Sequence, residues 1–142
     1  MTQEEKDLLL NDLCARLPFG VIVRHADPLI DNDGNETSEF WYKRGYLCDI
    51  TSLDDMTTTI IESEGSDEEG YEHICFLEKT VPYLRPMSSM TKEEHKEYEQ
   101  WLPDGYCIDT FDWLNAHHFD YRGLIKKGLA IEVTEENNPY KD

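Results

Sequence analysis

The chain has 142 residues and a formal net charge of -18, because 31 acidic side chains outnumber 13 lysines and arginines. This charge excludes direct binding of nucleic acid or an anionic membrane through phosphate contacts, and it favours a protein partner with a basic surface. The length suits one domain over 1–142, with a polar tail over 134–142. No apolar run approaches the roughly 20 residues of a membrane span, so a cytoplasmic protein is expected.

The first predicted element is an amphipathic helix near the N-terminus. Thr2 and Glu5 have the spacing of a capping box. Apolar side chains then recur at helical spacing, at Leu10, Leu13, Cys14 and Leu17. Pro18 should end this helix, and residues 21–23 should begin a strand.

Residues 27–39 are rich in Asp, Asn and Gly, and we predict that they form a loop. Asp31 and Asp33 suggest a calcium site. However, Gly34 stands at position 4 counted from Asp31, whereas an EF-hand loop needs Gly at position 6. A solvated turn between strands is therefore expected.

The central part of the chain predicts most of the sheet. Two aromatic-rich runs, 40–42 and 46–50, indicate two strands or one bulged strand. Residues 57–61 and 71–77 indicate a hairpin around an acidic loop. That loop, taken as 62–72, is either a solvated tip or an interaction surface.

The C-terminal part begins with an extended connection between Pro82 and Pro86. Thr91 and Glu94 have the spacing of a second capping box, so a short helix should follow. The side chains expected to be buried on that helix are Tyr98 and Leu102.

The stretch 109–133 predicts helix, turn, short helix and strand. Asp109 should cap a helix that reaches His118, and Asp120 should cap a second helix that ends at Gly128. Alternating apolar residues over 129–133 then predict a strand. The fold class is α+β, with a largely antiparallel sheet of four or five strands and with the N-terminal helix and C-terminal helices packed on it.

Three segments resemble a group of small acidic proteins of gut anaerobes and their phages. They are DLCARLPFGV at 12–21, PYLRPMSSMT at 82–91 and DWLNAHHFDYRGLIKKGLAIEV at 112–133. The group has no assigned activity, so the resemblance transfers no functional residue. It implies an accessory gene carried on a phage or another mobile element.

The four cysteines, Cys14, Cys48, Cys75 and Cys107, are far apart and form no Cys-x-x-Cys motif. We interpret them as small buried side chains, and we expect no metal site and no cofactor. His73 and Cys75 should share one face of a strand, with Cα atoms about 6 to 7 Å apart, so they are the weak candidates for catalysis.

Two further groups of residues are candidate sites. Adjacent histidines at 117 and 118 could bind zinc with a carboxylate, but neighbours on a helix point about 100° apart, so packing is the preferred interpretation. Candidate binding residues are the arginines that lie among aromatic side chains, together with those aromatics: Arg85, Tyr121, Arg122 and Tyr83. These arginines either pair with carboxylates inside the fold or bind an anionic ligand or partner.

The sequence thus predicts a small acidic accessory protein that acts by protein–protein interaction. A first alternative is a DNA mimic that inhibits a nucleic-acid-binding defence or regulatory protein, since carboxylates can imitate phosphates. A second alternative is a small enzyme that uses Cys75 and His73. No oligomeric state follows from the sequence.

Overall fold

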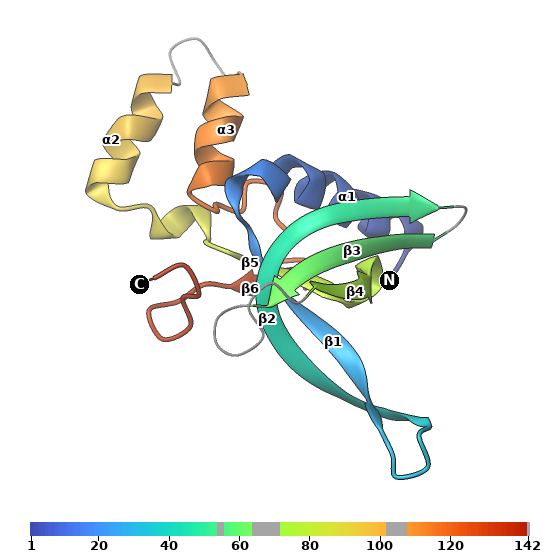
Figure 1. Cartoon of the computed structure of the whole chain (residues 1–142). Coiled ribbons are helices and arrows are strands. Elements are labelled where there is room, and N and C mark those ends of the chain that lie inside the picture. Colours follow the sequence, from blue (N-terminus) through green and yellow to red (C-terminus); the bar gives the residue numbers. More distant parts are fainter. Residues whose placement is uncertain (54–55, 64–71, 102–107, 142) are drawn as a thin grey trace. The chain divides into compact units, whose positions relative to one another are not determined.

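The computed structural model describes residues 1–53, 56–63, 72–101 and 108–141. The chain divides into two compact units, Met1–Pro82 (unit 1) and Tyr83–Asp142 (unit 2), which are described separately below. Figure 1 shows the elements of both units.

The α+β class is confirmed, but the sheet has six strands rather than four or five, in the order β4-β3-β2-β1-β5-β6. The strands are β1 (Ile22–Ile30), β2 (Glu36–Leu53), β3 (Met56–Ser63), β4 (Glu72–Phe76), β5 (Thr80–Leu84) and β6 (Ile131–Glu132). All pairings are antiparallel except β5 with β6. The connection at Pro82 is itself a strand, because it pairs with Val23 of β1.

Unit 1 begins with helix α1 (Gln3–Arg16), and its predicted capping box is confirmed. The Thr2 hydroxyl accepts the Glu5 N–H at 3.1 Å, and the Glu5 carboxylate accepts the Thr2 N–H at 3.1 Å. The prediction of which side chains of α1 are buried was wrong, apart from Leu13. The side chains that α1 buries are Leu9, Asp12, Leu13 and Arg16.

An ion pair explains this shift of the buried stripe. The Arg16 guanidinium donates to the Asp12 carboxylate at 2.8 Å, and both side chains are inaccessible to solvent. Two charged side chains that neutralise each other can therefore occupy positions where a hydrophobic pattern expects apolar residues. Cys14, predicted to be buried, lies on the exposed side of α1.

The predicted loop over 27–39 was too long, because β1 and β2 continue through most of it. The Asp31 carboxylate accepts the N–H groups of Asp33 and Asn35, both at 2.9 Å, and this closes a tight turn over 31–35. Residues 26–42 therefore form a two-stranded hairpin, here called the β1–β2 arm, which projects from the rest of unit 1 (Figure 1). β2 is one strand with a bulge between Leu47 and Asp49, as one of the two alternatives predicted.

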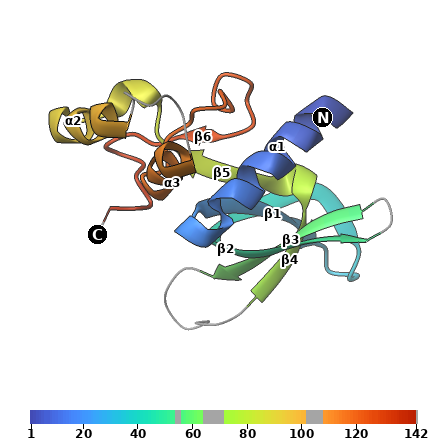
Figure 2. The ribbon, with the colours of Figure 1, turned by 90° about the horizontal axis from the view of Figure 1, so that it is seen from above.

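The predicted hairpin of β3 and β4 is confirmed, with pairing from Thr58↔Phe76 to Glu62↔Glu72. Residues 64–71 of the acidic loop lie outside the described residues. The sheet of unit 1 curls, so that strands which are not neighbours in its order come into contact. The Thr59 and Thr80 hydroxyls are 2.7 Å apart, and the Cys75 Sγ lies 3.8 Å from the Ala26 carbonyl oxygen. Helix α1 lies across these strands (Figure 2).

Unit 2 contains α2 (Lys92–Trp101) and α3 (Ile108–Ala116), which pack around a core of Tyr98, Leu114 and Phe119. The second capping box is confirmed, since Thr91 and Glu94 exchange hydrogen bonds of 2.9 and 3.1 Å. Leu102 lies outside the described residues. Asp109 lies within the first turn of α3 rather than at its cap, and α3 ends before His118.

The predicted helix over 120–128 is a series of turns instead. The Asp120 carboxylate does accept two N–H groups, from Leu124 and Ile125 at 2.9 and 3.0 Å. Gly128 has the predicted left-handed conformation, with φ of 75°. Because the Leu129 N–H closes this turn on the Leu124 carbonyl at 2.9 Å, the predicted strand shortens to β6.

The polar tail over 134–142 was expected to fray, yet Tyr140 ties it to the rest of unit 2. Its hydroxyl donates to the Tyr83 carbonyl at 2.7 Å, and its ring stacks on His118. In the part of the chain that the structure describes, no helix is long and apolar enough to cross a membrane.

Candidate functional site

Arg85 follows β5 and forms an ion pair with Glu94 within unit 2. Its guanidinium donates to both carboxylate oxygens of Glu94 at 2.7 Å, which is the bidentate geometry that suits arginine. It also donates to the carbonyls of His117 and Ser89, at 3.5 and 3.4 Å, and lies 4.2 Å from the centre of the Phe119 ring. These bonds favour internal pairing over an anionic ligand for Arg85.

Glu94 joins this pair to the start of α2. Its Oε1 accepts from Arg85 and also from the Thr91 N–H, so one carboxylate holds both the ion pair and the helix cap. Hydrogen bonding to Arg85, the largest effect, lowers the pKa of Glu94 from 4.5 to about 2. Glu94 is therefore ionised at all physiological pH values.

His118 has an unusual backbone conformation at the end of α3. The Phe119 N–H donates to the Leu114 carbonyl at 3.0 Å and the His118 N–H to the Asn115 carbonyl at 3.1 Å, which is a Schellman motif. The residue at this position needs a left-handed backbone and is usually glycine, but here His118 adopts it with φ of 63°. Its ring stacks on Tyr140 with centroids 3.6 Å apart.

A cavity of about 730 Å³ lies beside the Arg85–Glu94 pair, within the size range of small-molecule sites. Both histidines of the 117–118 pair line it, and His117 also stacks on Trp113 at 4.2 Å. No group of three potential metal ligands gathers among the described residues, so the geometry gives no support to the zinc alternative. The charged side chains of the wall are of both signs and select no class of ligand: Arg85, Lys141, Glu94 and Glu135.

The other predicted binding residues are also engaged within the fold. Arg122 donates to the Tyr121 hydroxyl at 2.8 Å and lies 4.7 Å from the centre of its ring, while Tyr121 donates to the Asn115 side chain at 2.8 Å. Tyr83 is buried. The structure thus places Tyr121 and Arg122 in one hydrogen-bonded group and Arg85 in another.

His73 and Cys75 lie on the same face of β4, as predicted, and the structure turns this face inward. A third member of this group, His25 of β1, was not predicted, and its ring lies 4.9 Å from the His73 ring. Only the curl of the sheet brings these strands together. Since Cys75 is 5% exposed and His25 is 1% exposed, a substrate cannot easily reach this cluster, and its geometry favours packing over nucleophilic catalysis.

The remaining cysteines differ from the prediction that all four are buried. Cys14 and Cys48 are exposed, because they lie on the outer side of α1 and beside the β2 bulge, while Cys107 is outside the described residues. Partial desolvation raises the pKa of the Cys48 thiol, although a hydrogen bond with the Glu62 backbone opposes this shift. A raised pKa reduces the thiolate fraction and hence the reactivity of Cys48.

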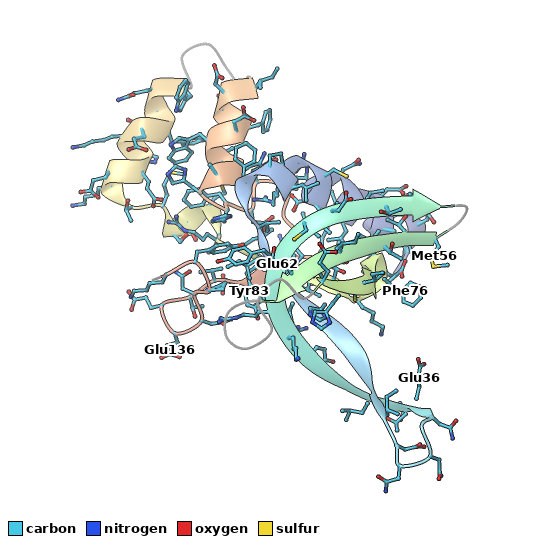
Figure 3. The ribbon with its side chains drawn as sticks, in the orientation of Figure 1. Glu36, Met56, Glu62, Phe76, Tyr83 and Glu136 are labelled. Carbon is cyan, nitrogen blue, oxygen red and sulfur yellow. The ribbon has the colours of Figure 1, made fainter. Side chains whose placement is uncertain are left out.

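The outer face of the β3–β4 pair is the surface that sequence reasoning missed. Large apolar side chains are uncovered there: Ile74 is 71% exposed, Phe76 54% and Met56 52%. Ile74 pairs with the half-buried Ile60, and we call these four residues, Met56, Ile60, Ile74 and Phe76, the β3–β4 outer face. Met56 and Phe76 lie at the same end of the strand pair and Glu62 at the other (Figure 3).

This arrangement inverts the usual alternation of a half-buried strand, because the smaller and more polar His73 and Cys75 face inward. The sequence signal that could have revealed this inverted alternation is Glu72, which is exposed and shares the face of Ile74 and Phe76. An alternation rule that buries the most apolar residues puts the wrong face of β4 inside.

Comparison of the chain with protein-family models, with curated proteins and with solved structures gave no match.

Proposed function

We propose that this protein acts by binding another protein, whose contact surface combines basic and apolar side chains. The observation that carries this proposal is the β3–β4 outer face, with Ile74, Phe76 and Met56 uncovered. Contiguous exposed apolar side chains that are rimmed by polar residues mark interaction sites in many proteins. The accessory role on a phage or mobile element, implied by the resemblance of three segments, is part of the same proposal.

The charge around this face supports a basic partner. Glu62 and Glu72 stand opposite each other at one end of the strand pair, and the whole chain carries a net charge of -18. A negative field of this size speeds the encounter with a basic protein and repels acidic ones. Burial of a large apolar side chain contributes roughly 1.5–3 kcal/mol, so the apolar contacts would supply most of the affinity.

The test is affinity capture from host lysate with three tagged forms of the full chain. They are the wild type, the double variant Ile74→Ser/Phe76→Ser, and Ile108→Ser as a matched control, since Ile108 is an exposed isoleucine on α3, outside the candidate surfaces. We expect wild type and control to retain a common basic partner that the double variant loses. If the double variant captures the same proteins as wild type, the outer face is not the binding site.

The β1–β2 arm favours a second candidate function, DNA mimicry. The sequence from Asp27 to Tyr42 contains acidic residues and no lysine or arginine, and Asp31, Asp33 and Glu36 are exposed near its tip. A projecting acidic hairpin could enter a groove that normally holds DNA. In this case the captured partner would be a DNA-binding protein, and duplex DNA would compete with the wild type for it.

Substitution of Asp33→Asn and Glu36→Gln separates the two functions, because Asp31 holds the turn and is left intact. A DNA mimic should lose at least tenfold in affinity with this arm variant and little with Ile74→Ser. Retention of full affinity by the arm variant would contradict mimicry.

A further inference from the structure

We infer that the partner presents an amphipathic α-helix, which lies along the β3–β4 outer face and places a lysine or arginine over Glu62 and Glu72. This binding mode rests on the proposed protein-binding function and names the part of the partner that is bound. Helices that lay an apolar stripe on an apolar surface are a recurring mode of protein recognition.

The apolar part of the face is open to such a helix. Ile74, Phe76 and Met56 are each more than half exposed, and Ile60, which pairs with Ile74, is half-buried. An extended segment laid on these side chains would lose the water that hydrates its N–H and C=O groups, and apolar side chains offer no replacement. An α-helix satisfies these groups internally, so it can cover the face without that loss.

Glu62 and Glu72 form one end of this face, and that end suits a cationic side chain. The two residues stand directly opposite each other on β3 and β4, where like charges repel. Tyr46 of β2 stands opposite Glu62 on its other side, and the Cys48 Sγ lies 3.7 Å from the Glu62 carboxylate. Neither neighbour carries a positive charge, so a cation supplied by the partner would relieve the repulsion.

The width of the surface matches that of one helix. Strands β4, β3 and β2 are consecutive in the sheet, and neighbouring strands lie about 4.8 Å apart, so the three strands span about 10 Å. An α-helix with its side chains is about 10–12 Å across. The β2 residues beside Ile60 and Thr58 are the exposed Asp49 and Thr51, which give the apolar strip a polar rim.

The length of the face sets the spacing of residues within the helix. Met56 and Phe76 lie at one end of the strand pair and Glu62 at the other (Figure 3). From Phe76 to Glu72 the strand rises about 14 Å, at about 3.4 Å per residue. A helix rises about 1.5 Å per residue, so this distance falls between positions n+8 and n+11 of the side that carries the residue n over Phe76.

The predicted motif is therefore apolar at n, n+3, n+4 and n+7, with lysine or arginine at n+8 or n+11. A helix that runs in the other direction shows the reverse order. A second copy of this chain is disfavoured as the occupant, because two chains that each carry a net charge of -18 repel one another.

The experiment selects binders of the immobilised full chain from two phage libraries, with counter-selection on Ile74→Lys. One library randomises the exposed face of a helix in a small helical scaffold, and the other contains unstructured twelve-residue peptides. Ile74 is exposed, so Ile74→Lys should fold, and circular dichroism checks that it does. We expect the helix library to yield binders with the predicted motif in one of its two orders.

Three results of this selection would overturn the inference. They are the absence of Ile74-dependent binders from the helix library, helical binders with no basic residue at the predicted spacing, and stronger enrichment of the unstructured peptides. Sedimentation of the wild-type chain as a dimer that Ile74→Lys dissociates would overturn it as well, since a second copy would then cover the face.

Exchange of charges then tests the position of the cation. Glu72→Lys should weaken the best helical binder at least tenfold, and replacement of the binder's basic residue by glutamate should restore most of the affinity for this variant. Glu136→Lys, at an exposed position of unit 2, makes the same change in net charge and should alter the affinity less than threefold. Equal losses with the two variants, or no restoration, would contradict a cation over Glu72.

The two proposals fail in distinguishable ways. If the captured partner depends on Ile74 and Phe76 but the helix library yields no such binder, protein binding stands and the helical mode is wrong. If capture is independent of both residues, the proposed binding site is wrong, whatever the helical binders do.

Discussion

The Arg85–Glu94 pair shows how one carboxylate can organise a small unit at the scale of single residues. Glu94 accepts two hydrogen bonds from Arg85 and one from the Thr91 N–H. Its side chain is 16% exposed, so solvent screens the pair only in part. Because Arg85 lies at the end of β5, this pair connects the strand to the start of α2.

The first prediction concerns the pH dependence of this pair. The pKa of Glu94 is lowered from 4.5 to about 2, so its stabilisation is fully present above pH 4.5 and is lost as the pH falls to about 2. Glu94→Gln should lower the free energy of unfolding of unit 2 by roughly 1–3 kcal/mol at pH 7. The difference from wild type should shrink towards zero near pH 2.

Urea unfolding monitored by tryptophan fluorescence at pH 7 and at pH 2.5 measures this difference. Glu99→Gln is the matched control on the same helix, since Glu99 is well exposed and pairs with His95 at the surface. A difference between Glu94→Gln and wild type that stays constant over this pH range would contradict the assignment.

The second prediction concerns the left-handed backbone of His118. Both His118→Gly and His118→Ala remove the ring that stacks on Tyr140, but only glycine adopts φ of 63° without strain. We expect the glycine variant to be more stable than the alanine variant by about 1 kcal/mol. The same comparison at Lys96, which is exposed inside α2, should have the opposite sign.

Thermal unfolding of these four variants measures both differences. If the alanine variant is more stable than the glycine variant at position 118, as is expected at position 96, then the backbone of His118 is not left-handed in solution.

At the scale of elements, the long strand β2 joins the two halves of the unit 1 sheet. Its Gly45 pairs with Val23 of β1 on one side and with Ser63 of β3 on the other. A Cβ atom at this position would clash with the Glu62 carbonyl oxygen and with the Ile61 side chain. Glycine is thus required here by a close approach of neighbouring strands rather than by a turn.

The third prediction follows from this approach. Gly45→Ala should lower the free energy of unfolding of unit 1 by roughly 1–3 kcal/mol, because backbone atoms of β3 must move. Lys43→Ala, at an exposed position of the same strand, should change it by less than about 0.5 kcal/mol. Chemical denaturation of the two variants tests this, and equal stabilities would show that β3 does not approach Gly45 so closely.

At the scale of the whole molecule, the net charge of -18 opposes folding. Like charges repel one another in the compact state, and salt screens this repulsion with a Debye length of about 10 Å at 0.1 M. The charge therefore favours solubility and a basic partner at a cost in stability.

The fourth prediction is that the thermal midpoint of the chain rises with salt. Between 20 and 500 mM sodium chloride, at pH 7, we expect an increase of several degrees by differential scanning calorimetry. Capture of a basic partner should weaken over the same range. A midpoint that falls with salt would show that attractive ion pairs, such as Lys6 with Glu78, outweigh the repulsion.

Some features of this protein follow from the sequence alone, and they are local. Both capping boxes, the left-handed Gly128 and the β3–β4 hairpin were predictable, because the hydrogen bonds that define them join residues near each other in the chain. The acidic charge is likewise a property of composition.

The tertiary structure decided which face of each element is buried. The Asp12–Arg16 pair sits where apolar residues were expected, and His25 meets His73 only because the sheet curls. The same curl turns His73 and Cys75 inward and leaves Ile74 and Phe76 uncovered, so it creates the candidate interface. Burial depends on contacts between distant segments, and a periodic pattern identifies two faces of a strand without stating which one the rest of the fold will cover.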